Sequence, residues 1–272
     1  MLMTVGDFRA HVRAHLQDLI EELKRLTGRS SRQEEDAWRA SLKQLASLLD
    51  EAVAPGVCLY LRVPGHIELE YQLPGSNQYV DAVLLGAHDS QAAAVFLELK
   101  NWDIRTDRPG GGESLIRRAG KQILHPSAQV RGYVEYCQYF HSAVHTYKAL
   151  CHGCVLFTGE DALAPYLAEP NAELTSRYPL FTDSDADRQR FATFMNERLS
   201  SPHPSFAEAF SNGYYRQNRN LIQQLAEQVK DAHAKPFALL GPQQLALARC
   251  VAAVRSAVYE WKANGRQRKV IL

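Results

Sequence analysis

The stretch VFLELKNW, residues 95–102, decides the fold. It begins as an apolar run typical of a buried strand and ends with an acid and a base two residues apart, Glu98 and Lys100. Because successive side chains of a strand point to opposite faces, Phe96, Glu98 and Lys100 share one face, and the residues between them share the other. A lone buried charge is costly, so this pair indicates either a solvated strand end or a site that needs a carboxylate and an ammonium together.

Composition sets the class of protein. At 272 residues and 46% hydrophobic content, the chain suits one large domain, or one domain with a smaller attachment. It has no run of about 18 apolar residues that could span a membrane. Residues 1–19 alternate charged and apolar side chains, as an amphipathic helix does, and do not resemble a signal peptide. We therefore expect no membrane partner and a cytoplasmic location. The net charge of +1 excludes a global attraction to nucleic acid, so any such surface must be local.

The five cysteines are scattered and odd in number, which predicts reduced thiols. One pair forms the motif CHGC, residues 151–154, which has the spacing of half a metal site. A zinc or iron–sulfur site needs four ligands, and no second CxxC pair occurs in the chain. The pair also begins the apolar run CVLF, so core packing is the favoured interpretation.

Around residues 95–102, β-branched and aromatic runs separated by turn residues predict a meander of strands. Its strands are GVCLYLRV (56–63), HIELEYQL (66–73), YVDAVLLG (79–86) and AAAVFLELK (92–100), with turns at PGSN (74–77) and AHDSQ (87–91). After a glycine-rich loop at 108–114, the pattern predicts a helix over 126–143, a strand at 154–159, a helix near 160–168, a strand at 178–181 and a helix over 185–199.

Helices are predicted at both ends of the chain. Residues 6–27 and 31–52 read as a helical pair, and a Ser31-x-x-Glu34 capping pattern opens the second helix. Residues 200–205 read as a linker, with helices following at 212–232 and 242–263 and a strand at RKVIL, 268–272. We therefore expect an α/β (α+β) fold, with a central mixed sheet flanked by helices. We divide it into a domain at 1–200 and a helical segment at 201–272, and we expect residues 206–272 to pack loosely or as an appendage.

Asp81 completes the constellation around Glu98. The turn between the two strands is centred near residues 89–90, so antiparallel pairing places Asp81 opposite residues 98–100. Asp81 and Glu98 could then hold a hard divalent cation, for which Mg²⁺ is the natural choice and Mn²⁺ a substitute. The Lys100 ammonium could position a nucleophile or stabilise negative charge. The alternative is an ordinary salt bridge among the three side chains.

Asp81, followed by a strand, a turn and Glu98-Leu99-Lys100, resembles the active core of the PD-(D/E)XK nuclease superfamily. The runs EYQLPGSNQYVDAVLLG (70–86), VFLELKNW, GGGE (110–113) and HPSAQVRGYVEY (125–136) resemble the nuclease-like domain that precedes a Schlafen-group-3-like helicase domain in bacterial proteins. The resemblance covers most of residues 5–272. It implies a restriction-endonuclease-like fold, Mg²⁺-dependent cleavage of nucleic acid, with DNA favoured over RNA, and a helicase partner.

The resemblance also implies further site residues. Gln129 and Tyr133 fit a pair that contacts substrate in that superfamily, and at i and i+4 they share one helix face; the alternative is a plain amphipathic helix. A glutamate from an early helix often joins the catalytic set, and Glu34 fits best, with Glu35 as its rival. Glu70 is a third candidate, because the turn at 74–77 brings residues 70–71 opposite Asp81.

Local charge predicts a phosphate-binding surface next to these residues. Between residues 100 and 133, seven basic residues stand against three acidic ones, an excess of four positive charges. We take Arg117, Arg118 and Lys121 as candidate substrate contacts, which would give affinity without reading sequence.

Three functions remain open from the sequence. The first is a Mg²⁺-dependent nuclease. The second is a non-catalytic nucleic-acid-binding module that loads substrate onto a motor, and the third is a purely structural interaction domain. No GxxxxGK[ST] motif occurs, so we expect no ATPase activity from this chain. Because RKVIL resembles the strand that precedes the phosphate-binding loop of helicase relatives, we expect either an excised N-terminal portion or a gene product without its motor.

Overall fold

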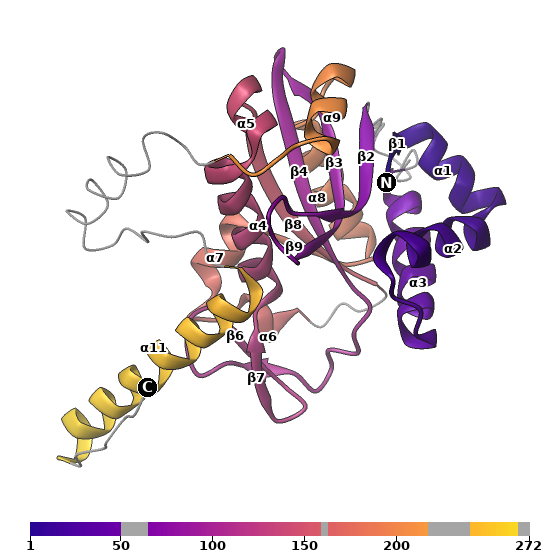
Figure 1. Ribbon diagram of the computed structural model, residues 1–272. Coiled ribbons are helices and arrows are strands. Elements are labelled where there is room, and N and C mark those ends of the chain that lie inside the picture. Colours follow the sequence, from indigo (N-terminus) through magenta and orange to yellow (C-terminus); the bar gives the residue numbers. More distant parts are fainter. Residues whose placement is uncertain (50–64, 159–162, 217–239, 266–272) are drawn as a thin grey trace.

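The computed structural model describes residues 1–49, 65–158, 163–216 and 240–265. Its centre is a six-stranded sheet in the order β1-β2-β3-β4-β8-β9 (Figure 1). These strands are β1 (Leu2–Thr4), β2 (His66–Gln72), β3 (Tyr79–His88), β4 (Gln91–Lys100), β8 (Leu150–Phe157) and β9 (Leu180–Phe181). The first four pair antiparallel, whereas β8 lies parallel to both β4 and β9. The predicted mixed sheet is confirmed; the strand expected at 56–63 lies outside the described residues.

The hairpin β3–β4 has the predicted register. Its ladder runs from Ala82 opposite Leu97 to His88 opposite Gln91. The two turn residues, Asp89 and Ser90, have φ angles of 46° and 66°. A tight two-residue hairpin turn requires such left-handed backbone, which small polar side chains tolerate best. The turn therefore fixes which side chains meet at the far end of the hairpin.

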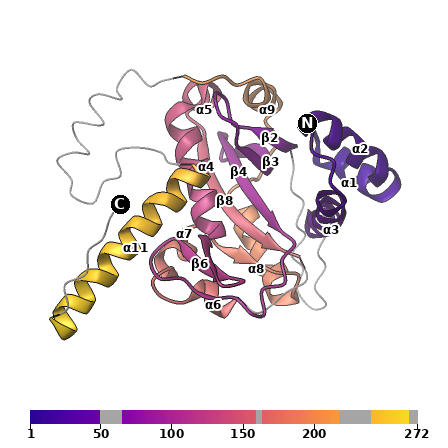
Figure 2. The ribbon, with the colours of Figure 1, turned by 60° about the horizontal axis from the view of Figure 1, so that its bottom comes forward.

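Helices cover both faces of the sheet, as predicted (Figure 2). One face packs against α1 (Val5–Ala14), α2 (Leu16–Thr27), α3 (Arg32–Leu49) and α8 (Asp185–Asn196). The other packs against α4 (Pro126–Phe140), α5 (Ser142–Tyr147) and α9 (Pro204–Ser211). Strand alternation divides β4 between the two cores: Val95 and Leu97 enter the first, and Phe96 enters the second. Glu98 and Lys100 consequently belong to the α4 side.

Two long helices of the prediction are each broken at a histidine. The helix expected at 6–27 is α1 and α2, separated by His15, whose φ and ψ of −137° and 35° are not helical. The helix expected at 126–143 ends at Phe140, and α5 begins after His141. Both predictions of one continuous helix were wrong because the apolar spacing continues through the break. Each half buries its own apolar face in the same core.

Among the described helices, three begin with a histidine whose side chain accepts a hydrogen bond from a backbone N–H of the first turn. In α4, the backbone N–H of Ser127 donates to Nδ1 of His125 at 3.1 Å. In α5, Nδ1 of His141 accepts from the N–H groups of Ala143 and Val144 at 3.2 and 3.4 Å. In α9, His203 accepts in the same way. His125 and His141 are fully buried, and burial lowers the pKa of each to about 4. Their imidazoles are neutral, as a hydrogen-bond acceptor at Nδ1 must be.

The segment between β4 and α4 holds structure that the sequence reading missed. A small antiparallel sheet consists of β5 (Arg108–Pro109), β6 (Leu115–Arg118) and β7 (Lys121–Leu124). Residues 108–114 were predicted as a loop, and part of that loop is β5.

Two short helices follow β8, namely α6 (Ala164–Leu167) and α7 (Ala172–Arg177). The helix predicted near 160–168 corresponds to α6, and residues 159–162 lie outside the described part of the chain.

The C-terminal region divides into a packed part and an extended part. The predicted linker at 200–205 was too long at its end, because α9 already begins at Pro204; Ser201 within it pairs with Ala87 of β3. Phe206 and Phe210 of α9 are fully buried in the core on the α4 side. The expectation of loose packing from residue 206 onward was wrong for α9, because two phenylalanines need an apolar contact surface. The two-domain division stays a prediction, but α9 packs in the same core as α4 and so belongs with residues 1–200.

The helix predicted at 242–263 is confirmed as α11 (Gly241–Asn264), which extends away from the sheet (Figure 1). Residues 213–216 are not helical, so the helix predicted over 212–232 does not begin where expected, and its remainder lies outside the described residues. The RKVIL strand also lies outside them. Among the helices that the structure describes, none has both the length and the apolar content to cross a membrane.

Candidate functional site

The ends of β3 and β4 bring Asp81 and Glu98 together. Ala82 of β3 pairs with Leu97 of β4. The next position along the hairpin therefore sets Asp81 opposite Glu98. The backbone N–H of Leu99 donates to Oδ2 of Asp81 at 2.7 Å, which ties the acid to the neighbouring strand. The predicted placement of Asp81 against residues 98–100 is confirmed. Glu98 is only 2% exposed, so it does not lie at a solvated strand end.

Lys100 completes this group from the same face of β4. Its Nζ contacts Oε1 of Glu98 in an ion pair and lies 3.4 Å from Oε1 of Gln129. Its side chain is 13% exposed. Burial alone would lower the pKa of Lys100, but Glu98 and Asp81 together raise it, so the side chain is an ammonium. The backbone is held as well, since Thr158 donates its N–H to the Lys100 carbonyl at 2.9 Å.

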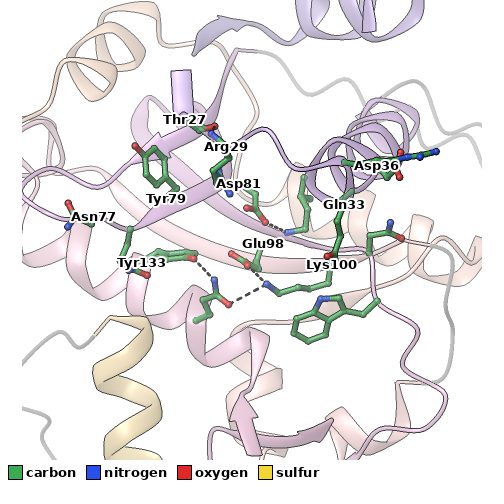
Figure 3. Close-up of a pocket in the computed structure, with 17 residues that line it drawn as sticks. Thr27, Arg29, Gln33, Asp36, Asn77, Tyr79, Asp81, Glu98, Lys100 and Tyr133 are labelled. Carbon is green, nitrogen blue, oxygen red and sulfur yellow. Dashed lines mark hydrogen bonds and ion pairs between the residues drawn. The ribbon is translucent and has the colours of Figure 1, made fainter. Parts of the chain in front are cut away.

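Gln129 and Tyr133 reach the same group from α4. Nε2 of Gln129 donates to the hydroxyl of Tyr133 at 2.6 Å, one helical turn away. Gln129 thus joins Lys100 to Tyr133, and Figure 3 shows Tyr133, Glu98 and Lys100 around one space. Burial and the nearness of Glu98 and Asp81 raise the pKa of Tyr133, which keeps the phenol protonated. The pair that the resemblance implied therefore lies at the candidate site.

Glu70 is the third carboxylate at this place. It is opposite Asp81, between the paired residues Leu69 and Tyr71 of β2. Its φ angle of 47° is unusual for a residue with a long side chain, and such strained backbone is often found at functional sites. The carboxylate is 5% exposed, accepts a hydrogen bond from Trp38 Nε1 at 2.6 Å and forms an ion pair with Arg29.

The two glutamates favoured from the early helix are engaged elsewhere. Glu34 forms a capping box with Ser31: its carboxylate accepts from the Ser31 N–H at 3.4 Å, and its own N–H donates to the Ser31 hydroxyl at 3.3 Å. It borders a small cavity next to Glu70 and Asp81, but its side chain is 35% exposed. Glu35 forms an ion pair with Lys24 at 2.9 Å. The structure therefore brings Glu70, rather than Glu34 or Glu35, into the acidic group.

Asp81 and Glu70 both have a raised pKa. Loss of hydration and the charge of Glu98 raise the pKa of Asp81 well above its usual range, and Glu70 adds to the effect. Burial raises the pKa of Glu70, with a smaller contribution from Glu98, against the opposing effect of Arg29. A bound cation would relieve this repulsion.

The residues present fit a hard divalent cation. Oε2 of Glu98 is buried and has no hydrogen bond of ordinary geometry, with the Tyr133 hydroxyl close to the carboxylate. Such an oxygen is costly unless something else occupies its lone pairs. Within the described residues, no three His, Cys, Asp or Glu side chains are arranged as a ready-made metal cage. Mg²⁺ suits such a sparse site, because it keeps several waters and binds proteins through one or two carboxylates.

The group opens into a cleft of about 1010 Å³. Its wall includes residues that the sequence reading did not select, among them Arg29, Tyr79 and Trp102. Arg29 lies with its guanidinium 5.4 and 5.5 Å from the rings of Trp38 and Tyr79. No motif marks these residues, because only the folded chain brings the segment after α2, strand β3 and the segment after β4 together. The charged side chains that line the cleft are Arg29, Arg32, Asp36, Asp81, Glu98 and Lys100.

The three candidate phosphate contacts lie on the small sheet and differ in solvent exposure. They are Arg117, Arg118 and Lys121. Arg117 and Lys121 are exposed, as is Arg108, which pairs with Arg117 across the strands. Arg118 is instead bound to Asp107 at 2.8 Å. The structure thus leaves Arg117 and Lys121 accessible and gives Arg118 an internal role.

The CHGC motif belongs to the core. Cys151 and Cys154 are three residues apart on β8 and enter opposite cores. Burial raises the pKa of Cys151 to about 12 and also raises that of Cys154, so both are neutral thiols. Gly153 lies under α4: a Cβ there would come within 2.2 Å of Val130. The motif therefore provides close packing between strand and helix.

Comparison with known proteins gives no significant match to a family model, a curated protein or a solved structure. The likeness to PD-(D/E)XK nucleases and their endonuclease-like fold accordingly stays a prediction based on the motifs.

Proposed function

We propose that the protein is a Mg²⁺-dependent nuclease, a hydrolase of phosphodiester bonds in nucleic acid. The observation that carries the proposal is the buried Oε2 of Glu98, which has no hydrogen bond of ordinary geometry and lies next to Asp81 and Lys100 in a cleft. An oxygen in that position needs a cation or a proton donor. The oxygen-rich surroundings favour a hard cation such as Mg²⁺ or Mn²⁺.

Each residue has a distinct proposed task. Asp81 and Glu98 hold the cation, with Glu70 adding negative charge behind them. Lys100 carries its positive charge toward the substrate phosphate and stabilises the negative charge that develops there. Gln129 and Tyr133 orient Lys100 and supply hydrogen-bonding groups to the substrate. When bound, the metal ion supplies Lewis-acid stabilisation and lowers the pKa of a bound water.

Substrate binding would extend from the cleft to the small sheet. Arg29 and Arg32 supply positive charge in the cleft, and Arg108, Arg117 and Lys121 supply it on the sheet surface. Contacts of this kind recognise the phosphate backbone and do not read bases. From the resemblance alone, we further propose that DNA is preferred over RNA, that a helicase motor works with this chain, and that it acts in the cytoplasm.

A binding module without chemistry is the second candidate. The observation in its favour is that Lys100 pairs with Glu98 and Arg29 pairs with Glu70. These two ion pairs neutralise two of the three carboxylates without a metal ion.

Cleavage assays separate the two candidates. The purified chain is incubated with labelled single-stranded DNA, duplex DNA and RNA, with Mg²⁺, Mn²⁺ or EDTA. We expect metal-dependent cleavage that Asp81→Ala and Lys100→Ala each abolish while leaving binding nearly intact. Glu173→Gln removes an exposed acid on α7 and serves as the control that retains activity.

Two results would reject the nuclease. Binding without cleavage under every metal condition supports the binding module. Cleavage that persists in Asp81→Ala assigns the activity to another site or to a contaminant.

A further inference from the structure

Lys100 is the last residue of β4, and its long side chain needs more than the backbone to hold it. A lysine side chain loses rotamer entropy when it is fixed in one position. Two of its contacts, Glu98 and Gln129, belong to the site already described. The third is different: Nζ lies 4.9 Å from the ring centroid of Trp102, two residues further along the chain. That distance is within the range of a cation–π interaction.

Trp102 is itself held from the small sheet. The guanidinium of Arg118 in β6 lies 4.6 Å from the same ring, and Phe157 of β8 meets the ring edge-on at 6.4 Å. Nη1 of Arg118 donates to the backbone carbonyl of Asp103 at 2.8 Å. The ring therefore has defined neighbours from three separate segments.

The anchor of this arrangement is Asp107. It is 1% exposed, and its Oδ2 accepts hydrogen bonds from Arg118 at 2.8 Å and from the hydroxyl of Tyr166 at 2.5 Å. A buried carboxylate with two strong donors is hard to displace. A continuous series of contacts thus runs from Asp107 through Arg118 and Trp102 to Lys100.

We infer that Trp102 is a positioning residue for Lys100. The small sheet holds the Trp102 ring in place through Arg118, which is itself fixed by its ion pair with Asp107. The part of the inference that concerns cleavage rests on the proposed nuclease function. The part that concerns the position of Lys100 does not, because side-chain accessibility is measurable without any activity.

The first experiment measures that accessibility. The protein is labelled with a short pulse of acetic anhydride, and modification of each lysine is followed by mass spectrometry. In Trp102→Leu, Lys100 should be acetylated about three to ten times faster than in the wild type. This increase corresponds to the loss of the protection that one cation–π contact gives. Trp102→Phe should lie between the two, because Phe keeps a ring with a weaker interaction. The exposed Lys43 is the internal reference, and Trp261→Leu, at an exposed tryptophan of α11, is the matched control.

An unchanged labelling rate of Lys100 in Trp102→Leu overturns the inference, as does an equal rise in Trp261→Leu. If Trp102→Leu does not fold, Trp102→Met replaces it, since Met fills irregular space without a π face. The same two criteria then apply.

The second experiment uses cleavage. In Trp102→Leu, kcat should fall about three- to tenfold with KM unchanged, and Trp102→Phe should recover most of the loss. A rise in KM with unchanged kcat would instead make Trp102 a substrate contact and overturn the positioning role. If the wild type does not cleave while the labelling result holds, the proposed function fails and the positioning role stands.

Discussion

Trp38 of α3 donates its indole N–H to the buried carboxylate of Glu70 at 2.6 Å. This bond joins the N-terminal helices to the sheet at the acidic group, where Glu70 also has left-handed backbone. The helical layer is therefore a structural support of the candidate site as well as a cover for the core.

Trp38→Phe tests this support. The substitution keeps the aromatic packing but leaves an oxygen of Glu70 without its donor. The free energy of unfolding in urea should fall by about 1–3 kcal/mol, the usual cost of an unsatisfied buried polar group. Trp261→Phe, at a side chain that is 55% exposed, should stay within about 0.5 kcal/mol of the wild type. Equal stabilities of the two variants would show that the bond contributes nothing.

Glu70 and Glu34 should differ in their effect on metal affinity. Titration calorimetry with Mg²⁺ should show Glu70→Gln binding about fivefold or more weakly, because a buried negative charge next to Asp81 is lost and Arg29 loses its nearer carboxylate partner. Glu34→Gln should stay within about twofold of the wild type, since that carboxylate caps α3. The reverse order would restore Glu34 as the third acid.

Arg117 and Lys121 should contribute to the salt dependence of nucleic-acid binding. Replacing both by alanine should reduce the slope of log K against log salt by about 2, since each contact releases about one counterion. The loss of affinity should be similar for all sequences, as measured by fluorescence anisotropy. Lys43→Ala is the control at an exposed lysine on α3. An unchanged slope in the double variant would remove the small sheet from the binding surface.

The histidine caps should make the fold sensitive to mild acid. The pKa of His125 and His141 is about 4 in the folded protein and about 6.5 when unfolded, so the unfolded chain takes up more protons between these values. Their stabilisation is complete above pH 6.5 and is lost as the pH falls toward 4, by up to about 3 kcal/mol for each histidine.

Urea unfolding at pH 7.5, 6 and 5 measures this loss. His141→Gln should be less stable at pH 7.5 and should show a shallower pH dependence. His11→Gln, at an exposed histidine of α1, should keep the wild-type slope. A wild type equally stable at all three pH values would contradict the neutral-cap interpretation.

The sequence predicted those parts of the site that local geometry determines. A two-residue turn at Asp89 and Ser90 fixes the register, so Asp81 could be placed against Glu98 by counting from the turn. Gln129 and Tyr133 were selected by the resemblance, and the helical repeat added that the two share one helix face. The division of the β4 side chains between the two faces of the sheet followed from the alternation along that strand.

The rest depends on contacts between distant segments. A glutamate three residues after Ser31 looks the same whether it caps a helix or joins a catalytic group, so Glu34 could not be separated from Glu70. The small sheet has strands of two to four residues next to several glycines, too short for a periodic signal. Arg29 and Trp102 are recognisable only when the segments around them are folded.

The packing of α9 sets the smallest unit that can fold. Phe206 and Phe210 fill the core on the α4 side, and Phe210 stacks on His141, the cap of α5. A chain shortened at residue 200 would open this core to water and remove the partner of a buried imidazole. The exposed apolar surface would then favour aggregation. Fragments intended for work on the candidate site should therefore extend past residue 211, although every proposed catalytic residue lies before residue 134.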